Sequence, residues 1–211
     1  LNKIKKNFDK PIVFLSKKLI RLGATPSKIG ILGLIFAIFA SFFFIISEYF
    51  LFINYVILGG GFFPQINYVV LGILFIILSA SMDAFDGAVA RIQKTTSSKG
   101  AFTDSFLDRI IEFVIVLGIQ IGGLASSIPI LLFFGTSMII SYVRARSESL
   151  GLNLSGVGLM ERAERIILLI VALSLSVLLN FDDFLNLSLY VISILNIITI
   201  IQRTRHSMKK L

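Results

Sequence analysis

The sequence predicts an all-α integral membrane protein with six transmembrane helices preceded by an N-terminal amphipathic interfacial helix. Hydrophobic residues make up 56% of the 211 positions. Several apolar runs reach or approach the length of about 18 residues that a membrane-spanning helix needs. The 20 lysines and arginines gather in a few places, namely residues 3–28, 91–99, 109, 144–165 and 203–210. We therefore expect a single membrane domain over residues 1–211, without a soluble domain.

The basic clusters also predict the orientation of the chain in the cell membrane. Positively charged flanks remain on the cytoplasmic side, and the intervening stretches 47–66, 122–128 and 180–187 contain no lysine or arginine. An even number of spans follows, with both termini and the basic loops in the cytoplasm. The charged start of the chain lacks the short apolar core and cleavage site of a signal peptide.

Residues 2–22 form the predicted interfacial helix. Apolar residues recur there at helical spacing, while basic residues fill much of the remaining surface: Ile4, Phe8, Ile12, Leu15, Leu19 and Leu22 against Lys3, Lys6, Lys10, Lys17, Lys18 and Arg21. Such a helix lies on an anionic leaflet, and Pro11 is the position where it would break. The alternative is a solvated basic flank that only fixes the topology.

Six apolar stretches follow a turn at residues 23–27. We expect the spans at residues 29–46 (with an apolar continuation to residue 57), 67–91, 98–121, 130–149, 160–179 and 187–201. Turn-forming and polar residues indicate external loops at residues 59–64, 122–129 and 180–186. This number of spans agrees with the even number that the charge distribution predicts.

Four aspartates within apolar sequence are the main candidates for chemistry: Asp83, Asp86, Asp104 and Asp108. A carboxylate at bilayer depth costs about 2.5–3.5 kcal/mol, so the four must lie near water, bind metal, or both. The spacings of three and four residues place each pair on one face of a helix. Carboxylate oxygens suit Mg²⁺, Mn²⁺ or Ca²⁺. With no cysteine and one histidine in the chain, a zinc or redox metal is not expected.

The aspartates belong to a longer pattern, D-x2-D-G-x2-A-R-x8-G-x3-D-x3-D, whose other fixed positions are Gly87, Ala90, Arg91 and Gly100. This pattern resembles the signature of the CDP-alcohol phosphotransferase family in every position and spacing. The six spans and the amphipathic start extend the resemblance to nearly the whole chain. The resemblance implies an enzyme in which an acceptor alcohol attacks the lipid-side phosphorus of a CDP-linked lipid, and CMP leaves.

The resemblance also implies roles for single residues. Asp83, Asp86, Asp104 and Asp108 would hold two Mg²⁺ or Mn²⁺ ions, and Asp108 would also be the catalytic base. The site for the CDP part of the donor would comprise these residues: Thr25, Pro26, Asp83, Gly87, Ala90, Arg91 and Gly100.

The residue types agree with such roles. Arg91 can contact diphosphate oxygens in a bidentate manner, and small side chains at Gly87 and Ala90 permit close approach of a nucleotide. Asp108 lies one helical turn beyond Asp104, where it can accept a proton from a hydroxyl. Arg109 is expected instead to pair with Glu112, three residues further along the helix.

Six arginines near the cytoplasmic ends of the last three spans indicate an acceptor that carries phosphate: Arg144, Arg146, Arg162, Arg165, Arg203 and Arg205. The preference for positive charge on the cytoplasmic side explains any one of them, but lysine would satisfy that preference equally well. Arginine is favoured where a side chain makes bidentate contacts to phosphate. The segments SYVRARSE and GVGLMERAERIILL resemble the branch that uses inositol 1-phosphate. The donor in that branch is CDP-archaeol or CDP-diacylglycerol, and a composition rich in Ile, Asn, Lys and Phe favours the archaeal lipid.

Two other functions remain open from the sequence. One is the same chemistry with glycerol 3-phosphate as the acceptor, and the other is a membrane transporter that uses the aspartates for cation coupling. The resemblance further implies a homodimer, for which Gly118, Gly122 and Gly123 provide small residues at a helix interface. The expected partners are the lipid bilayer, the two substrates and a second copy of the chain, and no nucleic acid is expected.

Overall fold

The computed structural model describes residues 2–52, 68–95, 97–179 and 183–211. All regular secondary structure in these residues is helical. The helices are α1 (Asn2–Arg21), α2 (Pro26–Phe52), α3 (Tyr68–Gln93), α4 (Ser98–Ile121), α5 (Ser127–Ser149), α6 (Arg162–Leu179) and α7 (Asp183–Met208). The elements predicted from sequence are therefore present, in the predicted order.

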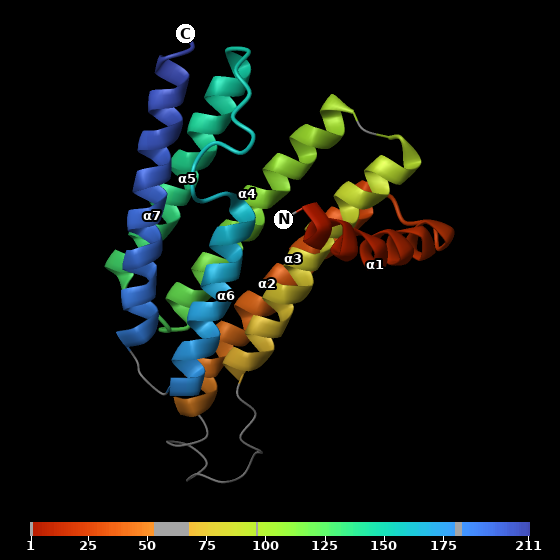
Figure 1. The fold of residues 1–211 in the computed structure, drawn as a ribbon. Coiled ribbons are helices and arrows are strands. Elements are labelled where there is room, and N and C mark those ends of the chain that lie inside the picture. Colours follow the sequence, from red (N-terminus) through yellow and green to blue (C-terminus); the bar gives the residue numbers. More distant parts are fainter. Residues whose placement is uncertain (1, 53–67, 96, 180–182) are drawn as a thin grey trace.

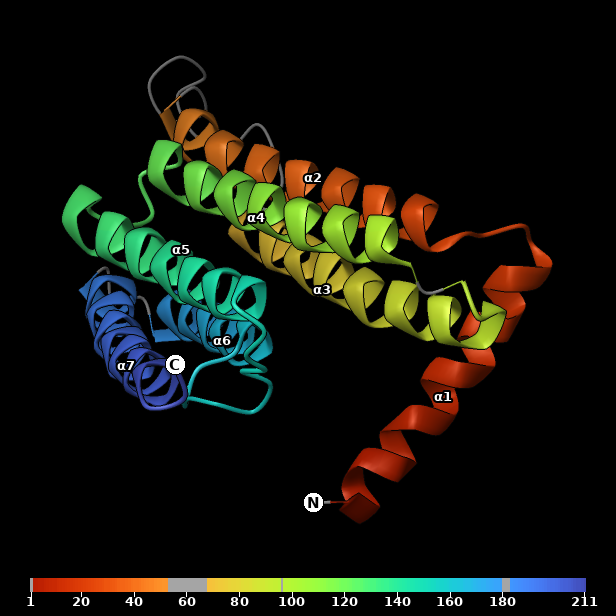
Figure 2. The same cartoon turned by 90° about the horizontal axis from the view of Figure 1, so that it is seen from above.

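Helix α1 lies across one end of the molecule, at a steep angle to the long helices (Figures 1 and 2). It packs against α3 and continues through Pro11, so the break expected at that proline is wrong. Gly23, at φ 78°, ends the helix in a left-handed turn. The side-chain amide of Gln93 donates a hydrogen bond to the Ala24 carbonyl at 3.3 Å, which joins this turn to the end of α3.

The long helices form two groups. In the first helix group α2 packs against both α3 and α4, and in the second helix group α7 packs against both α5 and α6. The groups meet where α3 contacts α6 and where α4 contacts α5, as Figure 2 shows from above. Part of the candidate functional site lies at this boundary.

Close packing in the first helix group depends on glycines. A Cβ atom added at Gly72 would collide with the Phe44 ring, and one at Gly118 with Ser41. A Cβ at Gly122 would collide with the Phe44 carbonyl oxygen. Because Gly118 and Gly122 face α2 of the same chain, they give no support to a dimer interface, contrary to the expectation from sequence.

The second helix group is joined instead by hydrogen bonds between small polar side chains. The Asn196 amide donates to Thr136 Oγ1 at 3.0 Å, and the hydroxyls of Ser147 and Ser207 lie 2.8 Å apart. All four residues are buried. Such bonds between helices are a common source of association in membrane proteins.

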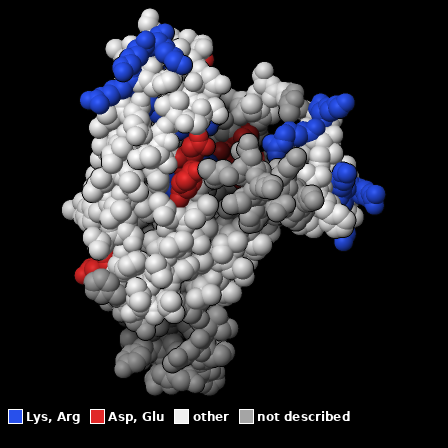
Figure 3. All heavy atoms as spheres, in the orientation of Figure 1, with Lys and Arg blue, Asp and Glu red and all other residues white. Residues whose placement is uncertain are grey.

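Four of the described helices are long and apolar enough to cross a membrane, at Pro26–Tyr49, Tyr68–Gln93, Ser127–Ser149 and Asp183–Met208. These helices support a multi-pass membrane protein. Helices α4 and α6, which the sequence also predicts as spans, lie beside them (Figure 1) but carry charged residues near the site. On the face drawn in Figure 3, lysine and arginine gather toward one end of the molecule.

Most predicted boundaries lie within a few residues of the observed ones, but α7 is longer than the span expected at residues 187–201. It begins at Asp183, so residues 183–186, predicted as loop from their polarity, are helical. An acidic residue in the first turn of a helix is favourable because it faces the positive end of the helix dipole. The loop predicted at residues 59–64 lies outside the described residues.

Candidate functional site

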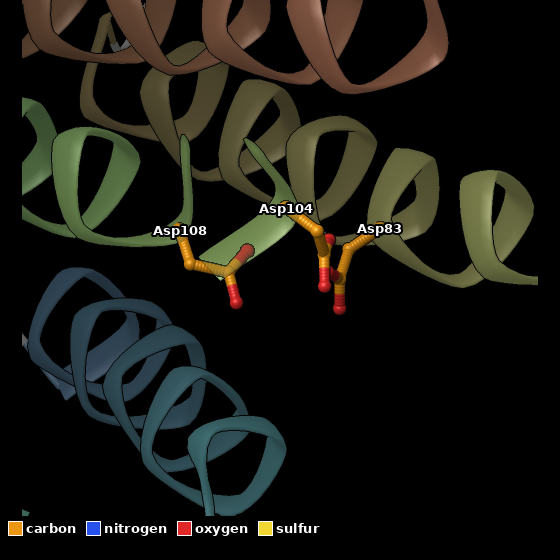
Figure 4. A group of neighbouring side chains, drawn as sticks. All are labelled: Asp83, Asp104 and Asp108. Atoms are coloured by element: carbon orange, nitrogen blue, oxygen red, sulfur yellow. The ribbon is translucent and has the colours of Figure 1, made fainter. Parts of the chain in front are cut away.

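Three carboxylates converge at the boundary between the helix groups. One ligand oxygen from each of Asp83, Asp104 and Asp108 lies within 4.8 Å of the others. Asp83 comes from α3 and the other two come from α4, and Figure 4 shows their carboxylates directed toward one space that faces α6. Oxygen ligands at this spacing suit one or two divalent cations with bonds of about 2.0–2.6 Å.

The turn between α3 and α4 explains this convergence. The Thr95 amide donates back to the Ala90 carbonyl at 3.1 Å, and Lys94 adopts a left-handed φ of 53°, which ends α3 abruptly. Ser97 then caps α4 by accepting a hydrogen bond from the Gly100 amide at 3.1 Å. The last turns of α3 therefore lie near the first turns of α4, where the sequence places the aspartates.

Asp86 lies outside this three-carboxylate cluster and faces a separate cavity of about 240 Å³, here called the motif cavity. Helices α2, α3 and α4 and the α3–α4 turn contribute its wall. The lining residues are Pro26, Ser27, Gly30, Asp86, Gly87, Ala90, Arg91, Thr95, Ser97, Gly100, Ala101, Thr103, Asp104 and Leu107. All the predicted nucleotide-site residues except Thr25 and Asp83 are in this set.

Thr25 has a structural position next to the motif cavity. Its side-chain oxygen accepts a hydrogen bond from the Lys28 amide at 3.4 Å, and Pro26 is the first residue of α2. This is the usual arrangement of a capping residue followed by proline at a helix start. Thr25 thus fixes the start of the helix that carries Pro26 into the cavity wall.

The glycine at position 87 is open to the motif cavity. A Cβ atom there would meet only the Arg91 guanidinium, at 3.4 Å. This differs from Gly72, Gly118 and Gly122, where the protein itself fills the space. Since no described neighbour packs closely against Gly87, a glycine there leaves room for a ligand rather than for another helix.

A second cavity, of about 430 Å³, lies on the other side of Asp104 and is here called the arginine cavity. Its lining residues are Asp104, Ser105, Asp108, Arg109, Met138, Ile140, Ser141, Tyr142, Arg144, Ala145, Glu148, Glu161, Arg162, Arg165 and Arg203. Four of the six arginines predicted for the acceptor are among them. Asp104 lines both cavities, so the two spaces adjoin at the carboxylate cluster.

Arg162, the first residue of α6, spans the carboxylate cluster. One of its terminal nitrogens lies 2.7 Å from Asp83 Oδ1 and 2.7 Å from Asp108 Oδ1. The sequence predicts Arg162 as a phosphate ligand but gives no indication of these two ion pairs. They place positive charge from the second helix group directly against the acidic residues of the first.

A second acid–arginine contact lies deeper between α4 and α6. Arg165 is 1% exposed and its Nε lies 3.4 Å from Glu112 Oε1. Glu112 also accepts a hydrogen bond from Arg109 at 3.1 Å, which is the pair predicted from the spacing. Glu112 lies one helical turn beyond Asp108, on the same side of α4. This spacing is the sequence signal that could have indicated its contact with Arg165.

Arg203 holds the loop that precedes α6. Its Nε donates to the Val157 carbonyl at 2.8 Å, and Thr199 Oγ1 accepts from the Met160 amide at 3.0 Å. Gln202 accepts from the Leu159 amide at 3.1 Å. Gly158, at φ 103°, lies so close to Thr199 that a Cβ would collide with it. These contacts from α7 fix the chain immediately before Arg162.

The other arginines are more exposed. Arg144 lines the arginine cavity and pairs with Glu148 at 2.9 Å, with about half of each side chain exposed. Arg146 and Arg205 are exposed and are not among the described residues that line this cavity.

Both cavities also have polar lining residues that the sequence does not single out. They are Ser27, Thr95, Ser97 and Thr103 in the motif cavity, and Ser141 and Tyr142 in the arginine cavity. Single serines and threonines carry no spacing signal, so the sequence could not have indicated them.

Figure 3 shows the surface over this region. Acidic side chains gather in a hollow at the centre of the face, and basic side chains lie on both sides of it. The site is therefore accessible from the surface, with both signs of charge around its mouth.

The chain is similar to proteins of one enzyme family over nearly its full length. A family model described as CDP-alcohol phosphatidyltransferase matches residues 23–202. The archaetidylinositol phosphate synthase of Pyrococcus horikoshii is 31% identical over 212 residues, which cover 100% of this chain and 98% of the relative.

Solved structures show the same fold. The crystal structure of Mycobacterium tuberculosis phosphatidylinositol phosphate synthase with CDP-DAG bound has a TM-score of 0.72 and 24% sequence identity, and covers 93% of this chain and 92% of that one. The crystal structure of the same protein in complex with manganese and citrate has a TM-score of 0.73 and 24% identity, and covers 93% and 88% of the two chains. The family inferred from the aspartate pattern is thus confirmed, and this chain belongs to the CDP-alcohol phosphatidyltransferase family of enzymes.

Proposed function

We propose that this protein transfers the phospholipid moiety of a CDP-linked lipid, either CDP-archaeol or CDP-diacylglycerol, to a hydroxyl of inositol 1-phosphate, with release of CMP. One observation carries the proposal. Two cavities adjoin at Asp104, one lined by the motif residues and the other by five arginines, of which four were predicted for the acceptor. A transfer between a nucleotide-linked donor and a phosphorylated acceptor needs two such compartments with the reacting groups between them.

The motif cavity suits the CDP part of the donor. Gly87 and Ala90 leave space along one turn of α3, and Arg91 borders the same space. An arginine guanidinium can neutralise and orient diphosphate oxygens. Asp86 and Asp104 line the same cavity, so a diphosphate bound there lies next to carboxylates that can hold divalent ions.

Asp83, Asp86, Asp104 and Asp108 would hold two Mg²⁺ or Mn²⁺ ions, which polarise the phosphorus and neutralise charge on the diphosphate. The three carboxylates that already converge and the purely oxygen donor set fit such ions. The structural relative solved in complex with manganese supports the same class of metal.

The arginine cavity suits an acceptor that carries phosphate. Arg144, Arg162, Arg165 and Arg203 surround it, and guanidinium groups match the geometry of phosphate oxygens. The similarity to an archaetidylinositol phosphate synthase over the whole chain supports inositol 1-phosphate. Arg146 and Arg205 were predicted for the same role, and their exposed positions make them the least supported of the six.

Asp108 is the proposed base. It lines the arginine cavity, and only 14% of its side chain is exposed. Its carboxylate is therefore at the wall of the cavity proposed for the acceptor. The acceptor oxygen forms a bond to the lipid-side phosphorus, the bond from that phosphorus to the CMP oxygen breaks, and the hydroxyl proton goes to Asp108. The products are a lipid phosphodiester and CMP.

We also propose that α4 and α6 cross the membrane, giving six spans, with both termini and the site on the cytoplasmic side and the chain forming one membrane domain. The lengths of α4 and α6, 24 and 18 residues, and the basic residues near the site support this arrangement. A homodimer is proposed from the family resemblance alone. Cysteine accessibility on the two sides of closed vesicles and mass measurement in detergent test these proposals.

The decisive experiment measures CMP release by purified protein with a CDP-lipid, in both ether and ester form, and Mg²⁺. Inositol 1-phosphate, glycerol 3-phosphate, free inositol and serine are offered separately. We expect release with inositol 1-phosphate alone. Release only with glycerol 3-phosphate would keep the transferase but replace the acceptor. Release with none of them would contradict the proposed function.

A further inference from the structure

We propose that Arg162 serves as an internal counter-cation of the carboxylate cluster, which divalent ions displace, so that metal binding releases its guanidinium to the arginine cavity. The inference rests on the proposed function for the identity of the acceptor, but the exchange itself concerns only Arg162 and the aspartates. It would make occupancy by metal a condition for strong binding of the acceptor phosphate.

The first observation is the position of the guanidinium. One nitrogen lies 2.7 Å from carboxylate oxygens of both Asp83 and Asp108, which come from different helices. These two residues, with Asp104, are the described residues whose oxygens converge as metal ligands. A guanidinium and a divalent cation carry the same sign of charge, so both cannot occupy the space between these oxygens at such distances.

The second observation is that this position leaves Arg162 only partly bonded. Its Nε is buried and makes no hydrogen bond with any described residue. A buried donor without a partner costs about 1–3 kcal/mol. The same side chain lines the arginine cavity, where an acceptor phosphate would provide oxygens to the guanidinium.

The third observation separates Arg162 from the other arginines of this cavity. Arg165 is buried beside Glu112, and Arg203 is bonded to backbone carbonyls of the loop and of α5. Arg144 pairs with Glu148 on its own helix, and Arg109 pairs with Glu112 on α4. Among the described arginines, Arg162 is the one whose ion pairs are made to predicted metal ligands, so it is the one that metal binding must change.

The exchange couples two binding events. Metal ions would release Arg162, and Arg162 would then contribute its charge to the acceptor site. By thermodynamic reciprocity, the acceptor must raise the affinity for metal by the same factor as metal raises the affinity for the acceptor. The enzyme would thereby favour acceptor binding only when the ions needed for the reaction are in place.

The test measures Mn²⁺ binding to purified, substrate-free protein, with free Mn²⁺ determined by electron paramagnetic resonance. Arg162→Gln removes the competing cation and is expected to bind Mn²⁺ about 10-fold more tightly than the unaltered protein. Lys99→Gln is the matched control, because Lys99 is exposed on the first turn of α4 and also loses one positive charge. Equal affinity in the unaltered protein and Arg162→Gln, or equal tightening in both variants, would overturn the proposal.

Arg162→Lys tests the exchange without removing the charge, should the glutamine variant fail to fold. The ammonium keeps the charge but lies on a shorter side chain, so the two ion pairs should weaken and the affinity for Mn²⁺ should lie between those of the unaltered protein and Arg162→Gln. An affinity equal to that of the unaltered protein would count against an exchange that depends on the bridging guanidinium.

A second measurement follows inositol 1-phosphate binding by calorimetry with and without Mn²⁺. Mn²⁺ is expected to strengthen binding to the unaltered protein, and most of this effect should disappear in Arg162→Gln. No effect of Mn²⁺ on the unaltered protein would contradict the coupling. If CMP release instead requires glycerol 3-phosphate, the acceptor assignment fails, while the substrate-free Mn²⁺ experiment still decides the exchange.

Discussion

The two helix groups contribute opposite charges to the site. The first group, α2–α4, provides the four aspartates of the motif, and the second, α5–α7, provides four of the five arginines that line the arginine cavity, the fifth being Arg109 of α4. Either set alone would place like charges close together, which is unfavourable in a membrane protein. Arg162 and Arg165 relieve this repulsion by reaching across from α6 to α3 and α4. The chemistry therefore depends on how the two groups meet.

The groups also differ in how they are packed. Glycines bring α2 into close contact with α3 and α4, whereas hydrogen bonds between small polar side chains join α5 and α7. The motif cavity is lined by α2–α4 and the α3–α4 turn, with glycines and alanines beside Asp86, Arg91 and Asp104. The arginine cavity lies between the groups and is lined by charged side chains of α4 together with those of the second group. This difference predicts that mutations in the two groups have separable effects on the two substrates.

The largest effect is expected for Asp108→Asn, which removes the proposed base from the first group. Turnover should fall by about 10³-fold, because general base catalysis typically contributes a factor of 10² to 10⁴. Binding of CMP or CDP-lipid should persist, since Asp108 does not line the motif cavity among the described residues. CMP release and nucleotide binding are measured on the same preparation.

Asp183→Asn provides the control, because it makes the same chemical change at the start of α7, far from the aspartate motif in the sequence. It should retain turnover. Normal turnover in Asp108→Asn would contradict its role as base, and loss of nucleotide binding would mean that the variant disturbs the donor side.

The next largest effect concerns the contact between the groups. Glu112→Gln leaves Arg165 buried without a charged partner, and breaking a buried ion pair from one side costs about 3–5 kcal/mol of stability. Thermal unfolding of the detergent-solubilised protein should show a marked fall in Tm.

Glu148→Gln makes the same change in an exposed pair with Arg144, where the expected loss is about 0–1 kcal/mol. A similar Tm change in both variants would show that Glu112 and Arg165 do not stabilise the boundary between the groups.

Arg144→Ala should affect the acceptor alone. It removes one guanidinium from the arginine cavity, and loss of a charged hydrogen bond of about 1.5–3 kcal/mol corresponds to a rise in acceptor KM of about 10- to 100-fold. The KM for CDP-lipid should remain nearly constant. Steady-state kinetics with each substrate varied in turn provide the comparison, and equal changes in both KM values would exclude a role specific to the acceptor.

The smallest effect is expected for Gly87→Ala, which should affect the donor alone. The added methyl group enters the motif cavity and meets only Arg91, so donor KM should rise severalfold. Stability should stay equal or rise by about 0.5–1 kcal/mol, because alanine is favoured over glycine within a helix.

Gly135→Ala on α5 is the matched control, since a Cβ there has nothing within 4 Å among the described residues. It should gain helix stability without a change in donor KM. If both variants leave donor KM unchanged, the motif cavity does not hold the reacting nucleotide.

Much of this architecture could be predicted from sequence because hydropathy and charge act over whole helices. The span expected at residues 98–121 coincides with α4. The aspartate spacing predicted one shared face for Asp83 and Asp86 and another for Asp104 and Asp108, and the observed cluster joins Asp104 and Asp108 with Asp83 alone. The separation of Asp86 from that cluster was not predictable, because it depends on the rotation of α3 against α2. The same holds for the ion pairs of Arg162, which join residues far apart in the chain.

The six arginines predicted for the acceptor show the same dependence on helix rotation. All six could be placed near the end of a helix, but whether a side chain faces the cavity depends on helix rotation and on the course of the loop before α6. Arg203 lines the cavity while Arg205, two residues further, is exposed. A spacing of two residues places side chains on different faces of a helix, and composition alone does not indicate which face is turned inward.

The attachment of the loop before α6 to α7 has a consequence for the biogenesis of the protein. The chain is synthesised from the N-terminus, so the aspartate-bearing helices emerge before Thr199, Gln202 and Arg203 are made. Until those residues arrive, nothing from α7 secures the loop that positions Arg162. A chain released before the final helix is made would therefore carry the aspartates of α3 and α4 without the α7 contacts that hold the loop before Arg162.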